Sequence, residues 1–141
     1  MIVYAESSAV LAWLLGETAG SRVSQILGKS EIVVVSDLTI LECERALIRA
    51  LALHEINPSA AGKIRARLDR AAAHWHLWRI SSEILQRARH PFPAEPVRTL
   101  DALHLASALA ARSAIPGLEL LSLDECIRRA GEQLGFRLHP A

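Results

Sequence analysis

Cysteine and long apolar segments are scarce in this chain, and each scarcity excludes a class of protein. The two cysteines, Cys43 and Cys126, lie far apart and form no C-x-x-C pair. This excludes a disulfide framework and a cysteine-based zinc site, and it indicates a reducing compartment. The apolar run 7–15 is too short to cross a bilayer, and no basic segment typical of a signal peptide follows Met1. We therefore expect a cytoplasmic protein with no membrane partner.

Neither sign of charge is in excess. Sixteen basic and 15 acidic residues leave a formal net charge of +1, which excludes binding to nucleic acid through overall positive charge but permits a local basic rim. The chain has 141 residues, of which 51% are hydrophobic and 22% charged. That size and composition predict one globular domain over residues 1–141, with too little chain for a second.

Short apolar segments alternate with helical segments from one end of the chain to the other. The expected strands are 2–5, 31–35, 74–80, 118–123 and 136–138. The expected helices are 9–15, 19–27, 38–54, 60–73, a short one that ends near residue 89, 100–112 and 125–134. This alternation predicts an α/β fold, a three-layer α/β/α sandwich with a central, mainly parallel sheet.

Three acidic residues lie at positions where such a fold binds ligands. Glu6 follows the first expected strand, Asp124 follows the expected strand 118–123, and Asp101 lies in the first turn of the expected helix 100–112. Ligands of parallel sheets bind beyond the carboxyl ends of the strands, where the strand order reverses. We therefore expect these three carboxylates to gather on one rim.

Asp101 is the most informative of the three. It is the single acid in an apolar first turn, with Thr99 as the expected N-cap and His104 one turn later on the same face. By itself, such an acid would do no more than complement the helix dipole, an effect of about 0.3–1 kcal/mol. The flanking Leu100 and Leu103 predict instead that the carboxylate faces a crevice, where it needs a cation, a proton or a metal beside it.

Helical periodicity does not decide which glutamate would be the fourth acid of the cluster. The expected helix 38–54 is apolar almost all the way round, so we expect it to be largely buried, and Glu42 and Glu44 are its interior acids. The two lie on opposite sides of the helix. Either is equally explained by an ion pair with Arg45 or Arg49, which would contribute only a few tenths of a kcal/mol.

Four segments, in order along the chain, resemble the motifs of the PIN-domain family, and in particular of its VapC-type toxin ribonucleases. The segments are IVYAESSA at 2–9, SDLTILECERAL at 36–47, RTLDALHLA at 98–106 and LSLD at 121–124, followed by LGF at 134–136. The resemblance covers essentially the whole chain, and its second motif selects Glu42.

The resemblance implies a metal-dependent endoribonuclease that is the toxin of a type II toxin–antitoxin pair. It implies that a cluster of carboxylates holds Mg²⁺, with Mn²⁺ as the alternative ion. The carboxylates are those of Glu6, Glu42, Asp101 and Asp124. Hard divalent ions prefer such oxygen ligands, and packed carboxylates would partly protonate without a cation. Glu6 and Asp101 are the expected direct ligands, and Glu42 and Asp124 are expected to bind directly or through water.

Neighbouring polar side chains are expected to orient these carboxylates. Ser8 and Ser122 are the candidates, together with His104, for which ordinary helix packing is an equally good explanation. The resemblance further implies an RNA substrate, a cognate antitoxin protein and a homodimer. Trp13 is a candidate for an interface of this kind, and core packing explains it equally well.

One residue departs from the family pattern. Position 6 is Glu, where the family usually has Asp, and the extra methylene moves the carboxylate outward and adds a rotatable bond. A geometry-sensitive Mg²⁺ site would be weakened by this change, whereas Mn²⁺ is more tolerant. The departure therefore favours an alternative function, a catalytically weak or inactive PIN-like module that binds RNA or a protein partner.

Other enzymes with an acidic pocket on a parallel sheet fit less well. Phosphoacceptor receiver domains and phosphatases with an aspartyl nucleophile generally need a lysine near the phosphate. Lys29 and Lys63 are the only lysines, and neither lies at the end of an expected strand. No Asp-x-Asp follows the first strand, and the absence of a glycine-rich phosphate loop argues against a nucleotide-binding Rossmann domain.

Overall fold

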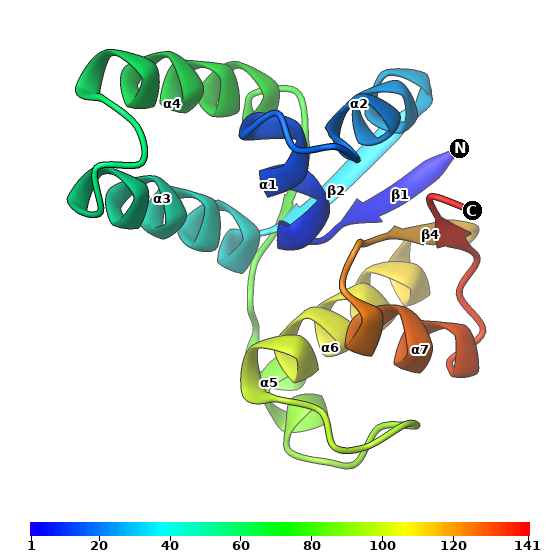
Figure 1. The fold of residues 1–141 in the computed structure, drawn as a ribbon. Coiled ribbons are helices and arrows are strands. Elements are labelled where there is room, and N and C mark those ends of the chain that lie inside the picture. Colours follow the sequence, from blue (N-terminus) through cyan, green and yellow to red (C-terminus); the bar gives the residue numbers. More distant parts are fainter.

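All 141 residues are described by the computed structural model, in which five strands form one parallel sheet (Figure 1). The strands are β1 (Ile2–Ala5), β2 (Ile32–Ser36), β3 (His76–Trp78), β4 (Leu118–Leu121) and β5 (Leu138–His139), in the spatial order β3-β2-β1-β4-β5. The chain first builds the sheet outward from β1 to β3 and then adds β4 and β5 on the other side of β1. The strand order therefore reverses between β1 and β4, where a ligand crevice is expected.

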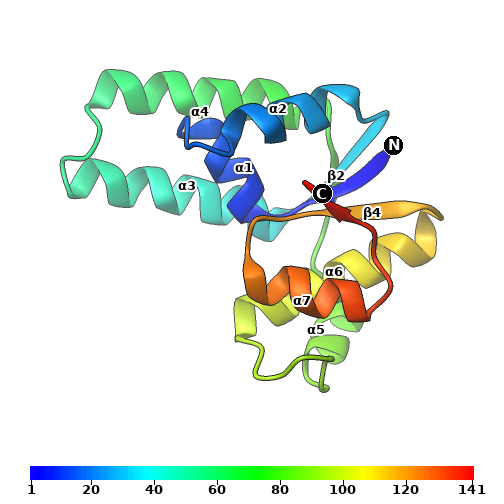
Figure 2. The same ribbon diagram turned by 45° about the vertical axis from the view of Figure 1, so that its right-hand side comes forward.

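The chain has seven helices, most of which cover the two faces of the sheet (Figures 1 and 2). They are α1 (Ser7–Leu14), α2 (Gly20–Lys29), α3 (Asp37–Ala52), α4 (Pro58–Ala72), α5 (Ser82–Ala88), α6 (Thr99–Ala114) and α7 (Glu125–Gln133). Helices α1 and α2 lie on one face and α5, α6 and α7 on the other, while α3 and α4 run side by side beyond the sheet. The predicted three-layer α/β/α sandwich is confirmed. None of these helices has the length and apolar character needed to span a membrane.

The side chains of β1 alternate between the two layers, as the pleat of a strand requires. Val3 and Ala5 enter the apolar cluster beneath α1, whereas Tyr4 enters the cluster that it shares with Leu105 of α6 and Ile127 of α7. The alternation carries the one polar group of this strand, the Tyr4 hydroxyl, into the layer that contains α6.

Trp13 of α1 packs within the chain. Its ring lies 5.9 Å from that of Trp75, and the guanidinium group of Arg67 lies over it at 5.2 Å from the ring centre. These contacts join α1 to the end of α4, and Trp13 stays partly exposed, so its place in an interface remains a prediction.

The expected start of α6 was wrong by one position. Thr99 is the first residue of the helix and not its cap, because Arg98 already has an extended backbone (φ −71°, ψ 161°) and its carbonyl accepts a hydrogen bond from the Ala102 N–H at 2.8 Å. No side chain caps this helix. Asp101 stays in the first turn, as expected.

The expected burial of the third helix was also wrong. The side chains of Leu41 and Ile48 are exposed, at 54% and 42%, and Leu53 just beyond α3 is 53% exposed. The reason is that α3 runs past the edge of the sheet beside α4 (Figure 2), so one of its apolar faces has no layer to cover it.

Two strands near the carboxyl terminus are displaced from their expected bounds. β4 ends at Leu121 because the N–H of Leu123 donates to the hydroxyl of Ser8 at 2.9 Å instead of continuing the sheet. Phe136 lies outside β5 because its N–H donates to the carbonyl of Gly131 at 2.9 Å and so closes the end of α7.

Candidate functional site

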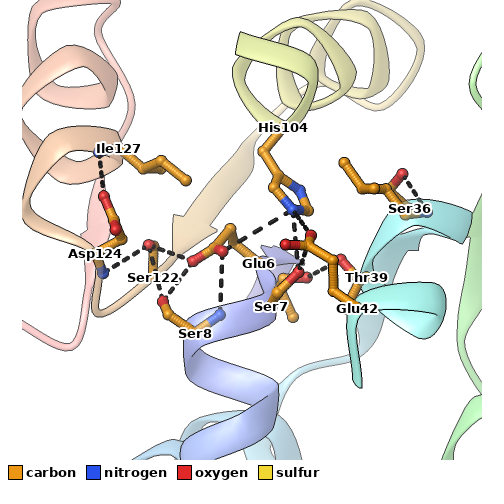
Figure 3. A network of polar contacts seen from close by, with 12 residues as sticks. Glu6, Ser7, Ser8, Ser36, Thr39, Glu42, His104, Ser122, Asp124 and Ile127 are labelled. Carbon is orange, nitrogen blue, oxygen red and sulfur yellow. Dashed lines mark hydrogen bonds and ion pairs between the residues drawn. The ribbon is translucent and has the colours of Figure 1, made fainter. Parts of the chain in front are cut away.

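Glu6 lies at the point where the strand order reverses. Its N–H donates to the carbonyl of Leu121 at 2.9 Å, so β1 and β4 end side by side. The side chain is the N-cap of α1, and its Oε1 accepts from the Ser8 N–H at 3.0 Å. Oε2 accepts from the Ser122 hydroxyl at 2.7 Å and from the Ser8 hydroxyl (Figure 3). Although Glu6 is only 4% exposed, both carboxylate oxygens are hydrogen-bonded.

Asp124 is connected to Glu6 through Ser122. The N–H of Asp124 donates to the Ser122 hydroxyl at 3.1 Å. Asp124 also caps α7, since its Oδ1 accepts from the Ile127 N–H at 2.9 Å. Ser122 and Ser8, the two serines expected to orient carboxylates, therefore both contact the acidic cluster.

Asp101 faces Asp124 across the ends of α6 and α7. Three possible ligand atoms lie within 4.8 Å of one another, one each from Asp101, Asp124 and Cys126. No other three side chains of His, Cys, Asp or Glu are grouped so closely. Burial raises the pKa of Asp101, and the negative charges of Asp124 and Glu6 raise it further. A cation would relieve this repulsion, and carboxylate oxygens are ligands suited to Mg²⁺ or Mn²⁺. The donor set thus fits such an ion.

Glu42 reaches the site from α3 and is held by two donors. Its Oε1 accepts from the Ser7 hydroxyl at 2.6 Å and lies 2.5 Å from Nε2 of His104 (Figure 3). Burial alone would raise the pKa of Glu42, but the hydrogen bonds from His104 and Ser7 outweigh it and hold the pKa below its ordinary value. Nε2 of His104 also lies 4.0 Å from Oε1 of Glu6, so the imidazole stands between the two glutamates.

The alternative acid of α3 stays outside this arrangement. Glu44 makes no side-chain hydrogen bond or ion pair, and neither Arg45 nor Arg49 pairs with an acid. The simple helical ion pairs that would have explained either glutamate are therefore not formed. Of the two, Glu42 is the one that the fold brings to Glu6.

Sequence reasoning missed three residues of the site: Tyr4, Ser7 and Cys126. Tyr4 is the only tyrosine of the chain, and a buried tyrosine hydroxyl usually needs a partner, which was a usable signal. Cys126 lies two positions after Asp124, at the start of the same helix. Nothing in the sequence separates Ser7 from its neighbour Ser8, because the choice depends on where α3 lies.

The fold and the site together define a parallel α/β protein with a carboxylate cluster where its strand order reverses. Comparison with known proteins identifies the family: the PIN-domain model matches residues 3–133, and the chain belongs to the PIN-domain family. The resemblance noted from the motifs is thereby confirmed.

Named relatives agree with this placement. Ribonuclease VapC35 of Mycobacterium tuberculosis is 31% identical over 137 residues, which cover 96% of this chain and 93% of the relative. The crystal structure of VapC20 of the same species, described as a sarcin-ricin loop cleaving toxin, superposes with a TM-score of 0.65 at 15% identity and covers 96% of both chains. A toxin–antitoxin complex from Klebsiella pneumoniae gives 0.59 at 19% identity, with 88% of this chain and 87% of that chain covered. At these identities the two structures support the fold.

Proposed function

We propose that this chain is a metal-dependent endoribonuclease, the toxin of a type II toxin–antitoxin pair, which hydrolyses RNA phosphodiester bonds in the cytoplasm. The observation that carries the proposal is the gathering of four acidic side chains at the reversal of strand order, namely Glu6, Glu42, Asp101 and Asp124. The 31% identical relative is named a ribonuclease, which supports the choice of RNA as the substrate.

The site would hold Mg²⁺ or Mn²⁺ through its carboxylates. Ligand atoms of Asp101 and Asp124 lie within 4.8 Å of each other, so these two residues would bind the ion directly. Glu6, which the sequence suggested as a direct ligand, and Glu42 would bind directly or through water. Such an ion, when bound, activates water and stabilises the leaving oxygen of a phosphodiester. The Ser122 hydroxyl hydrogen-bonds to both Glu6 and Asp124 and so holds these two residues in position. Groups that hydrogen-bond to metal ligands orient them in this way in other metal sites.

Two arginines beside the acids support a phosphodiester as the substrate. Arg98 and Arg129 line the same pocket as Asp101 and Asp124, and neither forms an ion pair within the chain. A guanidinium group binds phosphate oxygens with paired, charge-assisted hydrogen bonds. These side chains would bind the RNA backbone and offset its repulsion from the carboxylates.

The decisive test is cleavage of labelled single-stranded RNA with Mg²⁺, with Mn²⁺ and with EDTA. We expect cleavage with a metal, none with EDTA, and a loss of at least about 100-fold in Asp101→Asn, since a metal ligand is removed. Asp69→Asn is the matched control, because Asp69 is exposed on α4. Cleavage that persists equally in Asp101→Asn would contradict the proposed site.

The second candidate is a PIN-like module that binds RNA or a protein without cutting. It is favoured by one observation: both oxygens of Glu6 already accept hydrogen bonds from Ser8 and Ser122, which competes with metal binding. RNA binding without cleavage in either metal by a folded chain would support it, and Glu6→Asp is then the variant that tests for restored activity.

The proposed antitoxin would dock on the uncovered face of α3. Leu41 and Ile48 line an apolar groove there together with Leu100 at the start of α6, and Arg45 and Arg49 border it without acidic partners. Exposed apolar patches of this kind mark interaction sites, and the unpaired arginines suit an amphipathic segment with acidic residues. The solved toxin–antitoxin complex with this fold supports a partner of this kind.

Co-purification with the product of a neighbouring gene tests the antitoxin, and Ile48→Lys should abolish it without unfolding the chain. Retention of the partner by that variant would place its binding surface elsewhere. The homodimer implied by the family stays a prediction, which light scattering of the purified chain tests.

A further inference from the structure

A buried chain of polar groups leads from the core of the fold to Glu42. The Tyr4 hydroxyl and Nδ1 of His104 lie 2.9 Å apart, and the two residues are 100 positions apart in the sequence. Tyr4 is fully buried and His104 is 2% exposed. The imidazole is thus held from behind by β1, and its other nitrogen, Nε2, faces the carboxylates (Figure 3).

Counting protons identifies the donor in the contacts that Nε2 of His104 makes beside an ionised Glu42. The hydroxyl of Ser7 has one proton, which it donates to Oε1 of Glu42 at 2.6 Å. Ser7 therefore accepts at its 3.0 Å contact with Nε2 of His104, and Nε2 must carry a proton. The same N–H points at Oε1 of Glu42, 2.5 Å away.

The two oxygens of Glu42 consequently differ. Oε1 accepts from both Ser7 and His104, whereas Oε2 accepts no hydrogen bond within the chain. A glutamate side chain has three rotatable bonds, so two donors on one oxygen restrict the position of the other. Charge-assisted hydrogen bonds are the strong ones among those available to a carboxylate.

We propose that His104, held in place by the Tyr4 hydroxyl, is a positioning residue that fixes Oε1 of Glu42 and leaves Oε2 as the oxygen that binds the metal ion. The inference rests on the proposed function, since it assigns a ligand atom within the same site. His104 itself contacts neither metal nor RNA. The rival explanation is ordinary packing, in which the histidine contributes to stability alone.

Binding of Mn²⁺ to the full chain without RNA, measured by electron paramagnetic resonance or calorimetry, separates the two explanations. Tyr4→Phe keeps the ring and removes only the hydroxyl, and we expect it to weaken Mn²⁺ binding about tenfold, as loss of an outer partner does. His104→Leu should weaken it about 10- to 100-fold. His104→Gln, which places an N–H donor near the position of Nε2, should restore most of the affinity.

Two further variants make the test specific. Adding His104→Leu to Glu42→Gln should cause no further loss of Mn²⁺ affinity, because both changes disrupt the same interaction, that of Glu42 with the ion. His76→Gln is the matched control, since His76 is exposed on the edge strand β3. If His104→Leu does not fold, Tyr4→Phe and His104→Gln decide.

Wild-type Mn²⁺ affinity in folded Tyr4→Phe and His104→Leu would overturn the proposal, as would the absence of saturable Mn²⁺ binding by the wild-type chain. Mn²⁺ binding that depends on His104 in a chain that cuts no RNA would leave the positioning role intact and contradict the nuclease. RNA cleavage by the wild-type chain, together with wild-type Mn²⁺ affinity in Tyr4→Phe and His104→Leu, would support the nuclease and contradict the positioning role.

Discussion

The hydroxyl of Ser122 donates to Oε2 of Glu6 at 2.7 Å, across 116 positions of sequence. This bond ties the start of α1 to the loop that follows β4, and the same hydroxyl accepts from the N–H of Asp124 at 3.1 Å. Glu6, in place of the aspartate usual in the family, spans this gap while it also caps α1. The longer side chain is therefore part of the structure of the site.

Ser122→Ala should lower the free energy of unfolding by about 1–3 kcal/mol, because the partly buried N–H of Asp124 loses its acceptor and the buried carboxylate of Glu6 loses a donor. Urea denaturation measures the change. Ser113→Ala is the control, since Ser113 is exposed on α6 and its replacement should change stability by less than about 0.5 kcal/mol. Equal effects of the two variants would contradict a structural role for the Ser122 hydroxyl.

Asp101→Asn should be at least as stable as the wild type at pH 7 in EDTA. Burial, Asp124 and Glu6 raise the pKa of Asp101 above its ordinary value of 3.8, so the charged carboxylate opposes folding. The contribution of Asp101 to stability is present below that ordinary pKa and is lost as the pH rises through the raised pKa. The difference between variant and wild type should therefore shrink as the pH falls toward 4.

In millimolar Mg²⁺ the wild type should be more stable than Asp101→Asn. The ion stabilises only a chain that binds it, by an amount that grows with the ratio of its concentration to the dissociation constant. Thermal unfolding of wild type and Asp101→Asn, with Mg²⁺ and with EDTA, makes the comparison. A Mg²⁺-induced rise in Tm that is identical in both proteins would exclude Asp101 as a ligand.

The two glycines of α2 should respond oppositely to alanine. A Cβ at Gly20 would lie 2.4 Å from the carbonyl oxygen of Ala12 in α1, and since backbone cannot yield like a flexible side chain, Gly20→Ala should destabilise by about 1–3 kcal/mol. A Cβ at Gly28 meets nothing within 4 Å, so Gly28→Ala should stabilise the helix by about 0.5–1 kcal/mol. Denaturant melts of both variants test the close approach of α1 and α2.

Only one cysteine should react with iodoacetamide in the folded chain at pH 8. Burial, reinforced by Glu42 and Glu6, raises the pKa of Cys43 to about 12, and Cys43 is fully buried. Burial and the charges of Asp101 and Asp124 also raise the pKa of Cys126, but Cys126 is partly exposed. It should therefore react slowly and be the modified residue, because reactivity requires an accessible thiolate. Mass spectrometry identifies the labelled residue. Labelling of Cys43 before urea unfolds the chain would show that the layer beneath α3 opens.

Short-range signals in the sequence determined the elements and several of their ends. Alternating apolar and helical segments were enough to predict the layered α/β fold. Short polar side chains end the strands β2 and β4 locally, since Ser36 and Asp124 cap the helices that follow, accepting from the N–H groups of Leu38 and Ile127. Glu6 and Asp124 could be placed at the same rim because the carboxyl ends of parallel strands share one edge. The family motifs added Glu42, which periodicity alone did not select.

Only the tertiary structure decided which side chains meet. Strand order is absent from local pattern, so it took the fold to bring Ser122 onto Glu6 and to place Tyr4 behind His104. The exposed face of α3 was mispredicted for the same reason, since an apolar helix is buried only where another layer covers it. Local chemistry specified which residues can bind a cation, and the packing of helices on the sheet specified which oxygens remain free to do so.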